Sequence, residues 1–205
     1  MNANKFNVIL GTAHGANVGG KRSPDGRFYE YRYSREIAPL VKKELEKLGY
    51  NVYVDIMDNY VPTPQGAELR KRVDFVNRIC KGKGTKYCVY VSIHNNAAGS
   101  DGNWHNASGF SVFVSDNASL NSKKLAKIFT SNALRNDLCG NRSIPTQKYW
   151  SANLYVLRNT YCPAVLTENL FQDNKKDVDF LLSDDGKKEI VKLHVDSINE
   201  YVLSL

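Results

Sequence analysis

Hydrophobic positions along the chain follow two spacings, one typical of buried strands and the other of amphipathic helices. Short apolar runs predict strands at residues 6–10, 52–56, 87–93, 109–115 and 164–166. Apolar residues three or four positions apart predict helices over residues 37–48, 69–80, 125–138 and 190–202, the first ending at Gly49 and the third at Gly140. This alternation of strands and helices predicts an α/β fold.

Two segments carry neither pattern, residues 15–30 and 99–108, and both are rich in Gly, Asn, Ser and Asp. Long irregular loops are uncommon in a compact domain and are often functional. The chain has 205 residues, which suits one domain covering residues 1–205. It is 42% hydrophobic and 24% charged, as in soluble globular proteins, and no apolar run approaches the roughly 18 residues of a membrane span. We therefore expect no membrane insertion.

The charge balance limits which partners are expected, and the cysteine pattern limits which cysteine chemistry is expected. Lys and Arg number 28 against 21 Asp and Glu, a formal charge of +7 that favours polyanionic partners or simply keeps the surface soluble. No helix-turn-helix, RNA-binding or zinc-finger signature accompanies this charge, so nucleic acid is not an expected partner. The four cysteines form no C-x-x-C pair and are expected to be buried or free thiols. Residues 1–10 lack the pattern of a signal peptide, which predicts synthesis in the cytoplasm, or an export signal already removed.

Three of the predicted strands are followed by a side chain that can bind a metal or exchange a proton. His14 follows the first strand, His94 the third and Glu168 the last. In open α/β sheets the carboxyl ends of strands line the ligand crevice, so these side chains are expected to converge. Two imidazoles and a carboxylate suit zinc, and a separate carboxylate can carry the proton. His105, in a polar loop, is expected at the surface or the substrate rim, and His194, inside the last helix, is expected to be structural.

Four stretches of the chain together resemble a known enzyme family. They are His14-Gly15, residues 30–38 (EYRYSREIA), residues 92–97 (SIHNNA) and residues 154–168 (LYVLRNTYCPAVLTE). In this order they are similar to the zinc-dependent N-acetylmuramoyl-L-alanine amidases, and more narrowly to the type-3 amidase domain of bacterial autolysins and phage endolysins. The resemblance implies a peptidoglycan hydrolase that cuts the amide between the lactyl group of N-acetylmuramic acid and the L-alanine of the stem peptide. It also implies a twisted, mostly parallel sheet between helices, as in zinc carboxypeptidase-like and phosphorylase-like domains.

The resemblance further implies roles for single residues. His14, Glu30 and His94 would bind one zinc ion, and Glu168 would be the catalytic carboxylate. Glu36 is the alternative third ligand, but it falls on the helix proper, whereas the acidic ligand of the family precedes the helical stripe, as Glu30 does.

The sequence departs from the family pattern at two places beside these residues. Residues 11–13 (GTA) stand before His14 where the family usually has Asp-Pro-Gly. Residues 169–171 (NLF) follow Glu168 where the family usually has a small residue and then Gly-Phe. These departures bear on the turn before the first ligand and on the pocket wall behind the base.

Three further side chains are candidates for substrate contact. Trp104 offers an amphipathic ring for stacking on a sugar or lactyl face, or closes its loop onto the core. Arg142 and Arg158 can meet carboxylates of the substrate, and for Arg158 a structural salt bridge is the alternative.

Peptidoglycan and its muropeptides are the expected partners. The protein is expected to be a monomer that acts on the cell wall, either after release as a lysin or as a mature autolysin whose export signal was removed. A zinc peptidase acting on stem peptides and a non-catalytic cell-envelope binding module remain the alternatives. The metal content and the cleavage products distinguish these functions.

Overall fold

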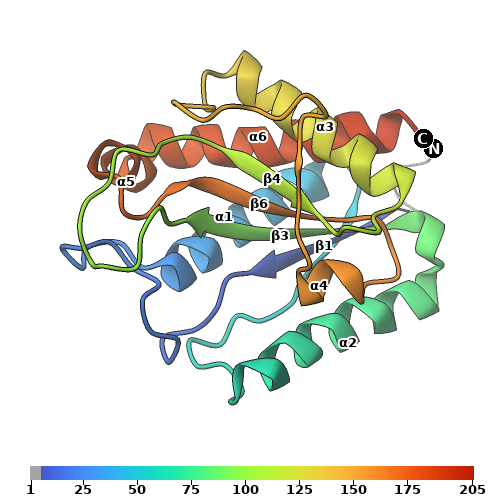
Figure 1. Ribbon diagram of the computed structural model, residues 1–205. Helices are drawn as coiled ribbons and strands as arrows, with labels where there is room; N and C mark the ends of the chain where they lie inside the picture. Colours follow the sequence, from blue (N-terminus) through green and yellow to red (C-terminus); the bar gives the residue numbers. More distant parts are fainter. Residues whose placement is uncertain (1–5) are drawn as a thin grey trace.

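A computed structural model describes residues 6–205, apart from the side chain of Gln65, as a six-stranded sheet between two layers of helices (Figure 1). The strands are β1 (Asn7–Thr12), β2 (Asn51–Val54), β3 (Cys88–Asn96), β4 (Ser111–Val114), β5 (Trp150–Ser151) and β6 (Ala164–Phe171). The helices are α1 (Glu30–Lys47), α2 (Gln65–Lys83), α3 (Leu120–Arg135), α4 (Tyr155–Arg158), α5 (Lys175–Leu182) and α6 (Asp184–Leu203), with a 3₁₀ turn, η2 (Thr85–Tyr87), before β3. The predicted α/β fold with a mostly parallel sheet is confirmed.

The sheet runs in the order β2-β1-β3-β6-β4-β5. β2, β1, β3 and β6 run parallel to one another, whereas β4 is antiparallel to β6 and parallel to β5. The carboxyl ends of β1, β3 and β6 therefore lie at one edge of the sheet, on the left in Figure 1. This edge is where a ligand site is expected in such a sheet.

The two faces of the sheet carry unequal hydrophobic cores. The larger core packs α1, α3, α5 and α6 against one face, and the smaller one packs α2 and α4 against the other. Alternation along the strands assigns each side chain to a face, because successive residues point to opposite sides. In β3, Val91 and Ile93 belong to the larger core, and Tyr90 belongs to the smaller one. His94 therefore points to the face that carries the smaller core.

Two strands are longer than the apolar runs predicted. β3 continues to Asn96 and β6 to Phe171, so His94 and Glu168 lie within the strands and not after them. The two segments remain strands because they pair with each other, His94 standing opposite Glu168 and Asn96 opposite Phe171. Cross-strand hydrogen bonds thus extend both strands through polar residues that the hydrophobic pattern does not include.

The third predicted helix is wrong at its end, since α3 stops at Arg135 and not near Gly140. Asp137 adopts a left-handed conformation (φ 53°), and the N–H of Leu138 donates to the carbonyl of Ala133 at 2.9 Å. The left-handed residue and this hydrogen bond are those of a Schellman motif, in which the apolar residue after the turn packs back onto the helix. Leu138 is buried for this reason and not because it continues the helical stripe.

The hydrophobic pattern did not reveal three short elements, which are β5, α4 and α5. Three of the helices begin at caps that the sequence carries: Ser119 accepts from the N–H of Ser122 at α3, Asn174 from that of Asp177 at α5, and Ser183 from that of Gly186 at α6. Within residues 6–205, no helix combines the length and the apolar character that crossing a bilayer requires.

The four cysteines are free and buried, as expected. The prediction about a signal peptide partly concerns residues 1–5, which lie outside the described residues.

Candidate metal centre and active site

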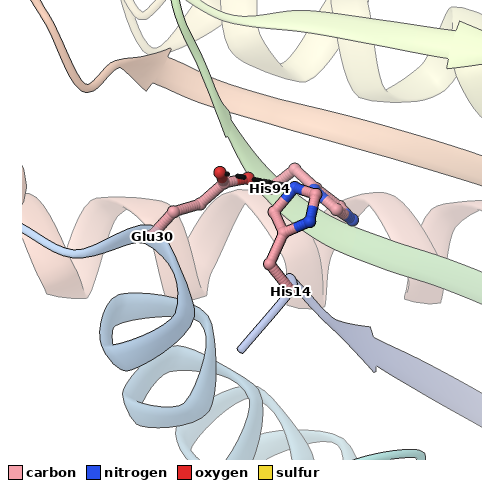
Figure 2. A group of neighbouring side chains, drawn as sticks. All are labelled: His14, Glu30 and His94. Carbon is pink, nitrogen blue, oxygen red and sulfur yellow. Dashed lines mark hydrogen bonds and ion pairs between the residues drawn. The ribbon is translucent and has the colours of Figure 1, made fainter. Parts of the chain in front are cut away.

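Three elements bring His14, Glu30 and His94 together at the carboxyl edge of the sheet (Figure 2). His14 follows β1 by two residues, His94 lies in the neighbouring strand β3, and Glu30 is the first residue of α1. Glu30 suits that position because the N-terminus of a helix favours a negative charge. The predicted convergence of the two histidines thus follows from the parallel pairing of β1 and β3.

The side chains of this group are close enough to share one ion. One nitrogen or oxygen atom from each residue lies within 4.8 Å of the others. The two imidazole rings are 5.1 Å apart between centroids and almost perpendicular. Glu30 Oε1 lies 2.9 Å from His94 Nδ1 and accepts from the backbone N–H of Asn95 at 3.1 Å. Glu30 Oε2 lies 3.6 Å from His14 Nε2.

The protonation of His14 and of Glu30 favours metal binding. Burial lowers the pKa of His14 from 6.5 to about 3, so its imidazole is neutral at pH 7 and keeps a free lone pair. For Glu30, burial opposes ionisation, but the hydrogen bond with His94 and the nearby positive groups outweigh it and lower the pKa to about 2. A neutral imidazole and an ionised carboxylate are the forms that bind zinc.

A second observation supports the fit of these three residues to a zinc ion. Glu30 is 1% exposed, and its Oε2 atom has no hydrogen-bond partner. Buried carboxylate oxygens are normally satisfied, so an unpartnered one that faces an imidazole marks a place where a cation would complete the bonding.

Glu168 stands beside this group without belonging to it. It lies in β6 opposite His94, on the same face of the sheet, and its Oε2 atom is also buried without a hydrogen-bond partner. Burial, together with the negative charge of Glu30, raises the pKa of Glu168 well above its usual value. A carboxyl group with a raised pKa close to a metal site is suited to take up and return a proton.

An extra residue in β6 shapes the chain directly behind Glu168. Between His94 and Asn96 on β3 there is one residue, whereas between Glu168 and Phe171 on β6 there are two, which makes a β-bulge. Leu170 takes up the extra residue with a left-handed backbone (φ 64°) and turns into the larger core. It occupies the position where the family pattern has glycine, the residue that adopts this conformation without strain.

Two cations flank the site, and the sequence pointed to only one of them. The charges of Lys21 and Arg142 both oppose the rise in the pKa of Glu168. The guanidinium of Arg142 lies over the rings of Trp150 and Phe171, at 4.8 and 5.3 Å from their centroids. Lys21 lies in the irregular segment before α1, and its carbonyl accepts from the N–H of Glu30 at 3.1 Å. Lys21 belongs to no sequence motif. The only sign of a functional role is that it lies in the irregular segment of residues 15–30.

A cavity of about 820 Å³ is lined by residues that flank Glu30 in sequence and by residues that follow β3 and β6, whereas the ligand group itself does not line it. The two irregular loops form its walls together with Tyr29 and Tyr31, which flank Glu30 in sequence, and with Gln172 and Asp173 after β6. Its volume is in the range of ligand pockets. Trp104 belongs to the second loop and is 37% exposed, so it does not close that loop onto the core.

The other candidate residues lie outside this group. Arg158 is exposed, donates to Asn153 at 2.6 Å and lines a different cavity with Pro163, where β6 begins, so the structure does not bring it to Glu168. Its contact with a substrate carboxylate therefore stays a prediction, and within residues 6–205 it forms no salt bridge. Glu36 pairs with Lys187 at 2.6 Å on the outer side of α1 and is not near the histidines.

The two remaining histidines lie where they were expected. His105 is in the loop, 2.9 Å from Asp101, and His194 is fully buried in α6.

Comparison with known proteins points to one family. The family model described as N-acetylmuramoyl-L-alanine amidase matches residues 8–200. The endolysin of Bacillus phage SPP1 is 30% identical over 129 residues, which cover 62% of this chain but only 45% of the endolysin, less than half its length.

Solved amidase structures share the fold. An N-acetylmuramoyl-L-alanine amidase from Clostridium difficile 630 has a TM-score of 0.81 at 24% identity, with 98% of each chain covered. The Ami1 amidase from Mycobacterium smegmatis has a TM-score of 0.83 at 17% identity over 100% of both chains.

Proposed function

Since the chain belongs to the N-acetylmuramoyl-L-alanine amidase family, we propose that it hydrolyses the amide between the lactyl group of N-acetylmuramic acid and the L-alanine of the peptidoglycan stem peptide. The observation that carries this proposal is the convergence of His14, Glu30 and His94 beside a separate carboxyl group, that of Glu168, whose Oε2 atom is buried. Metal-assisted hydrolysis needs this minimum set, three ligands and one proton carrier. The substrate is thus the bacterial cell wall, on which the protein acts as a lysin.

In this proposal His14, Glu30 and His94 hold one zinc ion. When bound, the ion supplies Lewis acidity, which polarises a carbonyl and makes water more acidic. His14 reaches the site as a neutral donor, and the buried charge of Glu30 offsets part of the charge of the cation. The hydrogen bond from the N–H of Asn95 holds the Glu30 carboxylate in place.

Glu168 is the proton carrier. Its carboxylate takes a proton from the attacking water and then returns a proton to the amine of L-alanine as the amide breaks. The raised pKa favours both steps, because it makes the carboxylate a stronger base and allows the acid to persist until the amine accepts the proton. Acid–base catalysis of this kind typically contributes about 10²–10⁴-fold to the rate.

The substrate reaches these groups through the cavity beside Glu30. Its walls carry Lys21, Tyr29 and Tyr31, which offer a cation for a carboxylate and aromatic faces for apolar groups. Arg142 approaches Glu168 from the opposite loop and offers a second cation. The formal charge of +7 assists the approach to anionic wall polymers.

The test combines metal analysis with mass spectrometry of digested muropeptides. We expect one zinc per chain and products with an intact lactyl carboxylate and a free L-alanine N-terminus. Products cut within the stem peptide would instead identify a peptidase, and a zinc-loaded protein that releases no product would identify a binding module.

Three substitutions assign the roles of the residues. Glu168→Gln should lower turnover by at least about 10²-fold with zinc still bound. His94→Ala should weaken zinc binding and abolish turnover. Glu36→Gln is the matched control, because Glu36 lies on the same helix as Glu30 but pairs with Lys187, and it should retain both. Undiminished hydrolysis by the Glu168→Gln protein would refute the assignment.

A further inference from the structure

The backbone carbonyl of His14 accepts hydrogen bonds from two buried arginines that lie on different helices. Arg35 Nη2, from α1, donates to it at 2.7 Å, and Arg72 Nη2, from α2, donates to it at 3.2 Å. Arg35 is 7% exposed and Arg72 is 3% exposed. Neither side chain belongs to the ligand group or lines the cavity beside it.

His14 needs such support because its backbone is in a disfavoured conformation. Its φ angle is 39°, in the left-handed region, which costs a non-glycine residue on the order of 1–3 kcal/mol unless its surroundings hold it there. The residues before it are fixed as well, since the N–H of Thr12 donates to Asp55 at 3.0 Å and that of Ala13 to Ser34 at 2.9 Å. This turn sets the direction in which the His14 ring leaves the backbone.

All the hydrogen bonds of Arg35 go to backbone carbonyls. Nε and Nη2 reach the carbonyl of Asp58, Nη1 reaches those of Ala13 and Tyr31, and Nη2 also reaches that of His14. Within residues 6–205 it forms no ion pair with a carboxylate. The planar fork thus ties the end of β1 to α1 and to the loop after β2, which the point charge of a lysine cannot do.

Arg72 forms ion pairs with two carboxylates, which balance the positive charge of the two arginines. Its Nη1 lies 2.8 Å from Asp55, and its Nη2 lies 2.9 Å from Glu68. Two arginines and two carboxylates thus bring equal charge into the interior. Burying four charges is expensive, and apolar side chains of similar volume would pack there at lower cost. In exchange, the two guanidiniums fix the position of the His14 carbonyl, to which both donate.

We propose that Arg35 and Arg72 are positioning residues that hold His14 in the geometry needed to bind the metal. They act through the His14 backbone and touch neither the substrate nor the reacting atoms. The inference rests on the proposed metal site. It adds that metal affinity depends on two side chains outside the ligand group.

The test measures zinc affinity by competition with a fluorescent chelator, with no peptidoglycan present. Removing groups that orient metal ligands typically weakens affinity about 10–100-fold, and we expect a loss in this range for Arg35→Lys. Arg72→Lys keeps the charge beside Asp55 and Glu68, so this milder change should fold readily and give a smaller loss. Leu45→Ala is the control for stability alone, since Leu45 is a fully buried residue at the far end of α1. It should lower the Tm of the metal-free protein without changing zinc affinity.

A double-mutant cycle shows whether the effect passes through His14. In a His14→Ala background, Arg35→Lys should cause no further loss of zinc affinity, because the ligand that it positions is absent. The same fold-loss in both backgrounds, or unchanged affinity in both lysine variants, would overturn the inference while leaving the proposed function intact. Failure of the unaltered protein to bind zinc would overturn both.

Discussion

His194 is a buried histidine whose protonation is coupled to folding. Its Nδ1 donates to the carbonyl of Ile190 at 2.8 Å, and its Nε2 lies 3.0 Å from the hydroxyl of Thr167. The ring of Phe129 packs edge-on against it, with centroids 5.4 Å apart. Because Nδ1 carries the hydrogen, Nε2 is the acceptor, and a second proton there would be buried next to apolar groups. The folded protein therefore resists protonation of His194.

The size of the effect follows from the shift in pKa. Burial lowers the pKa of His194 from 6.5 to about 4. Between these values the unfolded chain binds a proton that the folded chain does not, so stability is full above about pH 6.5 and falls as the pH drops towards 4. Each pH unit in this window corresponds to about 1.4 kcal/mol. Going from pH 7 to pH 5 should therefore remove about 2 kcal/mol of stability through this residue alone.

Urea unfolding of the unaltered protein and of His194→Gln, at pH 7 and at pH 5, measures the loss of stability that His194 causes. The experiment is done in EDTA, because metal binding is itself dependent on pH. Burial also lowers the pKa of His14, but that contribution is common to both proteins and cancels in the difference. We expect the loss between pH 7 and pH 5 to be about 2 kcal/mol smaller in the variant, whatever the substitution costs at pH 7.

The matched control is His105→Gln. Asp101 raises the pKa of His105, which is partly exposed, so its contribution has the opposite sign and its removal should not reduce the loss in acid. An equal loss between pH 7 and pH 5 in the unaltered protein and in His194→Gln would refute the reasoning, because it would mean that His194 is protonated as readily in the folded chain as in the unfolded one.

Two further substitutions test packing and capping. In Gly11→Ala the new Cβ would overlap the hydroxyl of Tyr90 and lie 2.8 Å from its Cζ, which should cost about 1–3 kcal/mol of unfolding free energy in urea. Adding Tyr90→Phe should recover part of this loss, and no recovery would contradict the contact. Ser119→Ala removes the cap of α3, whose Oγ accepts from the N–H of Ser122 at 3.1 Å, and should cost about 1 kcal/mol by the same assay. An unchanged midpoint would mean that the cap contributes nothing.

The chemistry of the site could be predicted where it depends on sheet topology. His14, His94 and Glu168 each come at the end of an apolar run, and parallel pairing brings those ends to one edge. Glu30 could be assigned only from the family resemblance, because no spacing relates it to the histidines. The sequence pattern ended both β3 and β6 too early, since hydrogen bonding between the strands and not hydrophobicity extends them.

The supporting residues could not be predicted, for a physical reason. Arg35 bonds to carbonyls of residues 21–23 positions away in sequence, and such contacts leave no periodic signal. Arg72 stands next to Val73 in an amphipathic helix, where an arginine is ordinarily solvated.

The unequal covering of the sheet separates the foundation of this protein from its working surface. The thick side, packed by α1, α3, α5 and α6, contains most of the buried apolar side chains, whereas His94 and Glu168 face the thinner side. Redesign of substrate preference through the loops that line the cavity can therefore proceed without disturbing the helices of the larger core. Attempts to raise heat resistance belong on α3, α5 and α6, because α1, on the same thick side, carries Glu30 and Arg35.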